Sequence, residues 1–343
     1  MPLSVDTLVS LVRLTVAHPA SLLAFLAYRY QQNAGSIPRD GLVTTAYVCL
    51  ALYASSWLNN RLRNGLLPLA RLNAKTWPQE LVFVTGGAAG IGKLTAERLA
   101  HKGAKVAAVD VVDFKPEHAN IKTYKCDISD IEALQAVREQ IVKDFGLQVT
   151  MVANIAGINN QKLILDLTAR DVDRMLNVNL KSHFWTAQVF LPAMVKRKRG
   201  HFLSVSSTMG LVGICHQSDY VAAKHGILGM HESLHYELQK MYKTPHVRTS
   251  TVVIGHTRTA LFNTFDVGVV GRFLSPLLEP SAVADRIVAQ FERQDGGMIL
   301  MPFTNELLPG IKGFPYWLRN VLQATSGADG AYTSRPSREQ LGE

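Results

Sequence analysis

Three residues of this 343-residue chain have types and a spacing suited to acid–base chemistry: Ser207, Tyr220 and Lys224. A phenol titrates near ~10, so a tyrosine acts as a base at neutral pH only when a cation lies close to it. Lys224 follows Tyr220 by four residues, and in a helix both side chains leave the same face. Ser207 precedes Tyr220 by thirteen residues and closes the segment SVSS at 204–207. The combination predicts a tyrosine that can act as an acid/base in proton transfer.

A second Tyr-x-x-x-Lys pattern, Tyr236 to Lys240, competes with the first. The chain has ten tyrosines, so one chance match is unsurprising. Ala223 stands thirteen residues before Tyr236, and this copy therefore has no matching serine. We expect the copy on Tyr220 to carry the chemistry.

A glycine-rich segment, TGGAAGIG at 85–92, follows a predicted strand and opens a predicted helix. Gly86, Gly90 and Gly92 would let the backbone turn tightly and approach a pyrophosphate held at the helix N-terminus. A P-loop is excluded because Leu94 stands where a magnesium-binding hydroxyl is required. The segment predicts a dinucleotide site.

The second predicted strand ends in Asp110, eighteen residues past Gly92. A carboxylate at this position can accept the adenosine ribose hydroxyls and would repel a 2′-phosphate. The alternative is an ordinary turn aspartate at a strand end. The position favours NAD over NADP as the cofactor.

The elements that must position these residues are short apolar strands alternating with helical stretches. The helical stretches include 91–102, 130–145 and 217–242. Seven strands joined by crossover helices imply an α/β fold with a Rossmann-like, doubly wound, seven-stranded parallel sheet, and we place this domain at 77–302. The predicted strands are 81–85, 105–110, 121–125, 149–154, 201–206, 247–254 and 298–301.

From about residue 81 to 301 the chain resembles the short-chain dehydrogenase/reductase family. Six segments carry this resemblance, and together they are specific. They are TGGAAGIG (85–92), CD (126–127), NIAG (154–157), VNL (178–180), SVSS (204–207) and YVAAK (220–224).

The resemblance implies roles for individual residues. Tyr220 would be the general acid/base, and Ser207 would fix the substrate oxygen. Lys224 would bind the nicotinamide ribose and lower the pKa of Tyr220, while Asn179 would hold a water in a proton relay. The family's usual Pro-Gly is Ile254-Gly255 here, before the matching Thr259. The implied cofactor positions are Thr85, Gly86, Gly90, Ile91, Gly92, Asp110, Asp127, Asn154, Ala156, Gly157, Tyr220, Lys224 and Thr259.

Two other patterns are interpreted as decoys. HESLH at 231–235 matches a zinc-protease motif, but Leu238 and Met241 stand where the extended motif has a glycine and a third histidine, so we expect no metal. The basic run at 196–199 has no accompanying aromatic platform, and we expect a loop that binds no nucleic acid. Three scattered cysteines argue against a disulfide framework.

The first 76 residues predict a membrane anchor. The segment 41–60 has no charged residue and is about as long as the ~20 residues that a spanning helix needs. Trp57 lies at its end, and Arg61 and Arg63 follow, which favours a cytosolic face for the rest of the chain. A buried core helix is the alternative for this segment. The stretch 1–28 is a second span, half of a hairpin or an interfacial helix.

Two apolar regions bear on the substrate. The first runs from Leu261 to Leu274, where the family keeps its substrate lid. The second, in the predicted tail 303–343, is a stripe that can either lie on a bilayer or cover the core. The lid residues are Leu261, Phe262, Phe265, Val267, Val269, Val270, Phe273 and Leu274, and the stripe is Phe314, Trp317, Leu318, Val321 and Leu322.

The layout of anchor, catalytic domain and tail is similar to the branch of retinol dehydrogenases and membrane 17-beta-hydroxysteroid dehydrogenases. This similarity implies an NAD-dependent oxidoreductase for a retinoid, steroid or fatty alcohol, located on the endoplasmic reticulum or lipid droplets. Helices 168–195 and 217–242 resemble those that form homodimers in the family. The alternatives are an NADPH-dependent reductase of a lipid ketone and a catalytically idle scaffold on the membrane surface.

Overall fold

The computed structural model describes residues 5–33, 35–37, 40–64, 69–262, 273 and 275–330. The chain divides into two compact units, Met1–Pro68 and Leu69–Glu343. The division falls eight residues before the predicted boundary at 76/77. Leu72 already belongs to the second unit, because it is buried there and its amide donates to the Glu292 carbonyl at 2.8 Å.

The first unit is helical. It contains α1 (Val5–Leu14), α2 (Pro19–Gln32) and α3 (Gly41–Asn64). Leu22 and Leu26 of α2 pack against Val43 and Ala46 of α3. By length and composition α3 can cross a membrane, with a mean hydropathy of 1.4 over an 18-residue window of which 11% is buried. The pair formed by residues 6–14 and 19–32 passes the same test together but is bent by 51°.

The second unit is built on a seven-stranded sheet in the order β3-β2-β1-β4-β5-β6-β7, with every neighbouring pair parallel. The predicted Rossmann-like, doubly wound sheet is thus confirmed. Each predicted strand is present within two residues of its expected ends. The strands are β1 (Leu81–Thr85), β2 (Lys105–Asp110), β3 (Ile121–Lys125), β4 (Met151–Asn154), β5 (Gly200–Ser207), β6 (Val247–Ile254) and β7 (Gly297–Met301).

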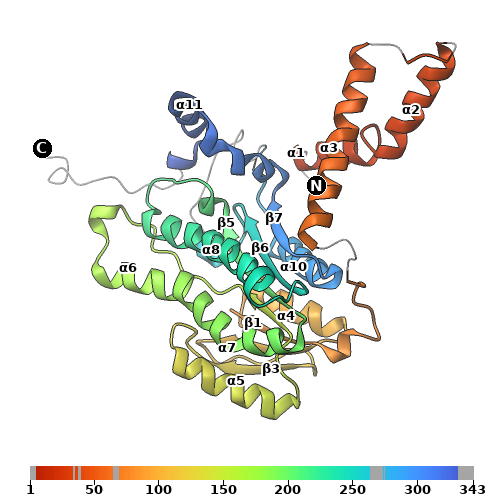
Figure 1. Cartoon of the computed structure of the whole chain (residues 1–343). Helices are drawn as coiled ribbons and strands as arrows, with labels where there is room; N and C mark the ends of the chain where they lie inside the picture. The colour runs from red at the N-terminus through yellow and green to blue at the C-terminus, as the bar shows by residue number, and fades with distance from the viewer. Residues whose placement is uncertain are drawn as a thin grey trace, which may run out of the picture. The chain divides into compact units, whose positions relative to one another are not determined.

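Helices cover both faces of this sheet (Figure 1). One face carries α5, α7 and α8, and the other carries α4 and α10. The α-helices are α4 (Gly90–His101), α5 (Ile131–Phe145), α6 (Ala169–Leu176), α7 (Ser182–Arg197), α8 (Ser218–Tyr236), α10 (Pro280–Arg293) and α11 (Tyr316–Ser326). Short helical turns connect them: η1 (Trp77–Gln79), η2 (Ile164–Asp166), η3 (Asn177–Lys181), η4 (Thr208–Gly210), η5 (Glu237–Met241), η6 (Ala260–Phe262), η7 (Phe303–Gly313) and η8 (Ala328–Gly330).

The alternation of side chains along the strands divides the core into two layers. Val82 and Val84 of β1 face the α4 and α10 side, where Leu99 and Phe291 are buried. Leu81 and Phe83 face the other side, against the helices α5 and α7. Because both faces are covered, the strands are apolar on both sides, which is the pattern of a buried parallel sheet. Because the strands are parallel, the carboxyl ends of β1, β2, β4 and β5 lie at the same edge of the sheet, and this edge holds the candidate site.

Candidate active site

The glycine segment turns sharply between β1 and α4. Gly86 has φ +70°, and a Cβ there would lie 3.2 Å from the backbone of Ala156. A Cβ at Gly92 would collide with the Gly86 carbonyl oxygen. The Thr85 hydroxyl accepts hydrogen bonds from the amides of Ile155 (2.9 Å) and Ala156 (3.0 Å). The loop is therefore a tight, open cradle tied to the end of β4.

Two carboxylates follow the neighbouring strands. Asp110 accepts hydrogen bonds from the amides of Ala88 (3.1 Å) and Val111 (2.8 Å), so it closes the glycine loop from the end of β2. Asp127 accepts from the amide (2.9 Å) and hydroxyl (2.7 Å) of Ser129. Both carboxylates are thus held in place by backbone donors.

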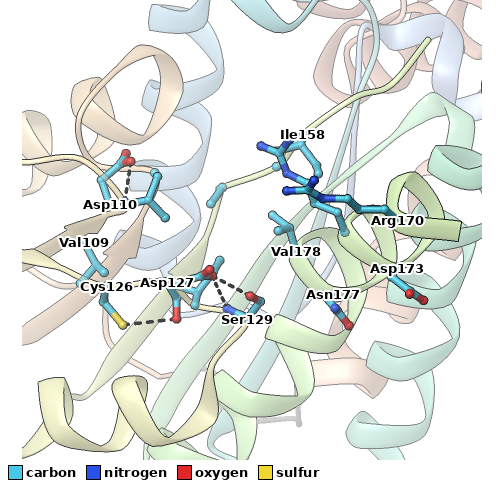
Figure 2. Close-up of a pocket in the computed structure, with 16 residues that line it drawn as sticks. Val109, Asp110, Cys126, Asp127, Ser129, Ile158, Arg170, Asp173, Asn177 and Val178 are labelled. Carbon is cyan, nitrogen blue, oxygen red and sulfur yellow. Dashed lines mark hydrogen bonds between the residues drawn. The ribbon is translucent and has the colours of Figure 1, made fainter. Parts of the chain in front are cut away.

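A cavity of about 630 Å³ opens between these carboxylates and the helix α6. Figure 2 shows Asp110 and Asp127 on one wall, with Ile158, Arg170 and Val178 opposite. The lining residues are Gly86, Val109, Asp110, Val111, Cys126, Asp127, Ile128, Ser129, Ala156, Gly157, Ile158, Arg170, Asp173, Arg174, Asn177 and Val178.

Two lining residues, Arg170 and Arg174, were not predicted as site residues from the sequence. They lie four residues apart on α6 and therefore share a helix face. The sequence shows this spacing, but only the packing of α6 against η3 and α8 shows which face meets the cavity.

Tyr220 and Lys224 lie together on α8, and both are buried. The Lys224 ammonium nitrogen is 5.4 Å from the centre of the Tyr220 ring and donates to the Val205 carbonyl at 3.1 Å. Burial lowers the pKa of Lys224 from 10.5 to about 8. The lysine thus stands beside the phenol with its charge poorly solvated.

Ser207 ends β5 close to this pair. Its hydroxyl accepts from the Met209 amide at 3.2 Å, and the Met209 side chain packs on the cluster that contains Tyr220. The neighbouring Ser206 hydroxyl donates to the Lys224 carbonyl at 3.1 Å. The end of β5 therefore contacts α8 at the candidate catalytic residues.

Asn179 is fully buried in the π-helical turn η3. Its side chain exchanges two hydrogen bonds of 2.8 Å with the backbone of Ile158. A Cβ at Gly157 would lie 3.3 Å from the Asn179 amide oxygen and 3.8 Å from the Lys224 nitrogen. Gly157 thus permits η3, the end of β4 and the lysine to come together.

A polar network that the sequence did not predict lies near Lys224. The Ser204 hydroxyl is 2.8 Å from both His183 Nδ1 and His231 Nε2, and the Asn154 amide reaches it at 3.4 Å. Burial lowers the pKa of His183 well below its usual value, with a smaller effect from the Lys224 charge. Asn154 is therefore occupied with this network, and it is not among the residues that line the cavity.

Thr259 lies beside the glycine loop, with its methyl group 4.0 Å from where a Cβ of Gly90 would stand. The loop before it is held without the family's proline: Gly255 donates to Met301 at 2.7 Å, and Arg258 donates to Leu278 at 2.9 Å. Of the predicted lid, Phe265, Val267, Val269, Val270 and Leu274 lie outside the described residues.

The second Tyr-x-x-x-Lys pattern and the HESLH motif have different surroundings from the candidate site. Tyr236 and Lys240 are exposed, unlike the buried first pair. His231 bonds Ser204, and His235 Nε2 is 3.1 Å from the Gln239 amide nitrogen. Within the described part of the chain, no three His, Cys, Asp or Glu side chains gather as a metal site.

The basic run is more than a solvated loop, because two of its members bind a buried carboxylate. Arg197 and Arg199 approach Glu80 at 3.2 and 3.0 Å, and the Glu80 side chain is only 2% exposed. These ion pairs tie the end of α7 and the start of β5 to the start of β1.

The residues of the cleft fit a dinucleotide. A cradle that tolerates no Cβ at Gly92 leaves backbone amides of the α4 N-terminus open to a pyrophosphate. The cavity beside it presents the Asp110 carboxylate, and the buried Tyr220–Lys224 pair lies beyond Gly157.

Comparison with known proteins agrees with this geometry. The family model described as short chain dehydrogenase matches residues 80–267. "Short-chain dehydrogenase/reductase family 16C member 6" of Bos taurus is 36% identical over 193 residues, which are 53% of this chain and 60% of that protein. "Epidermal retinol dehydrogenase 2" of Homo sapiens is 31% identical over 234 residues, 65% of this chain and 74% of that protein. The ligand-free aldohexose dehydrogenase of Thermoplasma acidophilum shares the fold, with a TM-score of 0.57 at 23% identity over 65% of this chain and 92% of that chain.

Proposed function

Because this chain belongs to the short-chain dehydrogenase family of NAD(P)-dependent oxidoreductases, we propose that it oxidises a lipophilic alcohol with NAD, or reduces the matching carbonyl. The observation that carries the proposal is the buried Tyr220–Lys224 pair, with 5.4 Å between the ammonium and the ring centre, beside the Ser207 strand end. A tyrosine needs a cation beside it to act as a general acid/base at neutral pH, and this pair brings the two together.

In this proposal each residue acts at a named atom. Bound NAD supplies the hydride acceptor. The Tyr220 oxygen takes the hydroxyl proton of the alcohol, and the Ser207 hydroxyl holds the substrate oxygen in place. The Lys224 ammonium favours the phenolate electrostatically and binds the ribose of the cofactor. Asn179 holds η3 against Ile158, which positions the turn for the water relay that the family resemblance implies.

Asp110 supports NAD as the cofactor. Its carboxylate lines the cavity and is fixed by two backbone amides, so it would repel a 2′-phosphate. A second candidate, an NADPH-dependent reductase, is favoured by Arg170 and Arg174, which line the same cavity. Fluorescence titration with NADH and NADPH separates them: we expect NADH to bind more tightly, and preference for NADPH would favour the reductase.

The lipophilic substrate and the membrane location are part of the same proposal. They are supported by the candidate span α3 and by the similarity to a retinol dehydrogenase. We place the protein on the endoplasmic reticulum or lipid droplets, with the catalytic unit cytosolic. An apolar groove of about 550 Å³ between α7 and α8 supports a homodimer through these helices; Leu191, Val195 and Met230 are among its lining residues.

The decisive experiment compares Tyr220→Phe with Tyr236→Phe in detergent-purified protein. Loss of one proton-transfer group costs a factor of about 10²–10⁴, so we expect Tyr220→Phe to lose turnover by that factor while keeping NADH affinity. Tyr236→Phe removes an exposed hydroxyl of the same motif and should leave turnover unchanged. Retained turnover in Tyr220→Phe would contradict the mechanism, and if neither nucleotide binds the wild type, an idle scaffold becomes the better hypothesis.

A further inference from the structure

Helix α11 and the segment before it present an unusual apolar surface, which we call the α11 patch. It consists of the exposed side chains of Leu307, Phe314, Tyr316, Trp317 and Val321. Trp317 is 66% exposed and Tyr316 is 70% exposed. The helix projects from the periphery of the catalytic unit (Figure 1), and none of its eleven residues is buried.

The apolar face of α11 points to solvent and its polar face points to the domain, which is the reverse of an ordinary surface helix. A helix on a water-soluble domain directs its apolar stripe to the core and its polar face to solvent. In α11 the half-buried positions include Arg319, Gln323 and Ser326, while Trp317 and Val321 face outward. Of the stripe predicted from the sequence, Leu318 alone is half-buried. The core-covering alternative is therefore not what the structure shows.

The inward polar face is fastened to the loop between Ser207 and Tyr220. Gln323 donates to the Gly213 carbonyl at 3.1 Å. Asp329, which Gln323 also contacts, accepts from the Cys215 amide at 3.0 Å. Before the helix, Lys312 lies 2.7 Å from His225, the residue after Lys224. The orientation of α11 is thus fixed by the active-site loop and is not a consequence of loose packing.

The chain itself favours a bilayer as the occupant of the patch. Trp and Tyr with a nearby cation are the side chains that settle at the lipid headgroup level, and Arg319 stacks on Tyr316 at 5.7 Å. Seven residues, 65–71, join the candidate span α3 to the fixed Leu72, and at ~3.6 Å per residue they reach at most about 25 Å. Such a tether holds a weak contact at an effective concentration on the order of millimolar. The tail 331–343 contains only Ala331, Tyr332 and Leu341 as apolar residues, so its composition does not suit the patch.

We propose that the α11 patch is a docking surface for a phospholipid bilayer, which seats the active-site loop at the membrane. Its consequence, delivery of a lipophilic alcohol from the bilayer to the cleft, rests on the proposed function, but the docking itself does not.

The test uses the full chain reconstituted in phosphatidylcholine–phosphatidylserine vesicles that contain brominated phosphatidylcholine. Four tryptophans fluoresce in the wild type, and the difference between wild type and Trp317→Phe isolates the signal of Trp317. We expect brominated lipid to quench this signal by at least half and aqueous iodide to quench it little. The matched control is the difference for Trp77→Phe, whose ring is 1% exposed inside the catalytic unit and should escape both quenchers.

Two other quenching results would overturn the proposal. Quenching of Trp317 by iodide and not by lipid would mean that the patch faces water. Protection from both quenchers would mean that a protein surface covers it, such as a second copy of the chain. A second pair of variants, Trp317→Glu and Asn320→Glu, separates docking from turnover: only the first should raise the KM for retinol supplied in vesicles, by about tenfold or more. If no alcohol is oxidised while lipid still quenches Trp317, the proposed function fails and the docking surface stands.

Discussion

Replacing Lys224 by methionine should abolish activity and yet make the protein more stable at neutral pH. The side chain is buried, and burial lowers its pKa from 10.5 to about 8. Between these two values the folded protein is deprotonated at this site and the unfolded chain is protonated. Because the unfolded state then binds more protons, stability rises with pH across the window from 8 to 10.5. Below pH 8 the folded protein bears the full cost of a buried charge.

The magnitude follows from the shift in pKa. At 1.36 kcal/mol per pKa unit, the charged lysine costs about 3 kcal/mol at pH 7 and about 1.4 kcal/mol at pH 9.5. Methionine avoids this cost but loses the hydrogen bond to the Val205 carbonyl, worth about 1–2 kcal/mol. We therefore expect the variant to exceed the wild type by about 1–2 kcal/mol at pH 7, and its advantage to fall by about 2 kcal/mol at pH 9.5.

Urea unfolding of both proteins in the same detergent at the two pH values measures this change. The chain supplies a matched control in Lys240→Met, which alters the exposed lysine of the second Tyr-x-x-x-Lys pattern. For this control we expect a difference from wild type near zero at both pH values. If the advantage of Lys224→Met did not change between pH 7 and 9.5, the lysine would not carry a depressed pKa, and the argument for a poorly solvated cation beside Tyr220 would be wrong.

Two further predictions concern buried groups around the sheet. Burial lowers the pKa of His231 from 6.5 to about 3, so the folded protein keeps the ring neutral while the unfolded chain is protonated below pH 6.5, and stability falls with acid. His231→Gln should reduce the loss of unfolding free energy between pH 7 and 5 by about 2 kcal/mol in urea titrations, and an unchanged loss would show that the ring is solvated. Glu80→Gln removes the charge that Arg197 and Arg199 share. It should cost about 2–3 kcal/mol, near the low end for a buried pair because both arginines are half-exposed, and an unchanged thermal midpoint would show that these pairs contribute nothing.

The fold was predictable because its signals are local. Most strands are short apolar runs bounded by polar or glycine residues, because a sheet covered on both faces needs no alternation of polar residues. The edge strand β3, Ile121–Lys125, is the exception, since only its first residue is buried. The limits of β4, β5 and β7 differ from the prediction by one or two residues, because hydrogen bonding to a neighbouring strand decides where a strand begins and ends. The turn Glu237–Met241 also changes to a π-helix after α8, for which the predicted helix at 217–242 held no signal.

Parts of the site could not be predicted because they depend on contacts between distant segments. Ser204 looked like one more residue of the strand motif, yet it joins His183, His231 and Asn154 from three other elements. A serine hydroxyl shared by two histidines has no pattern along the chain. Arg170 and Arg174 show the same limit, because their helix could have presented either face to the cleft.

The two Tyr-x-x-x-Lys patterns show that the same pair of residues can be a candidate acid/base at one place and an ordinary surface pair at another. Both have the same spacing on one continuous helical stretch, formed by α8 and the π-helical turn η5, so each lysine lies about one turn after its tyrosine. Tyr220 and Lys224 fall where this stretch crosses the ends of β5 and η3, and the Val205 carbonyl and Ser206 hydroxyl hold them there. Tyr236 and Lys240 are exposed, so water solvates both the phenol and the ammonium. Burial against a strand end therefore distinguishes a candidate base from a surface tyrosine, and the serine thirteen residues earlier was a usable sequence marker because it belongs to that strand end.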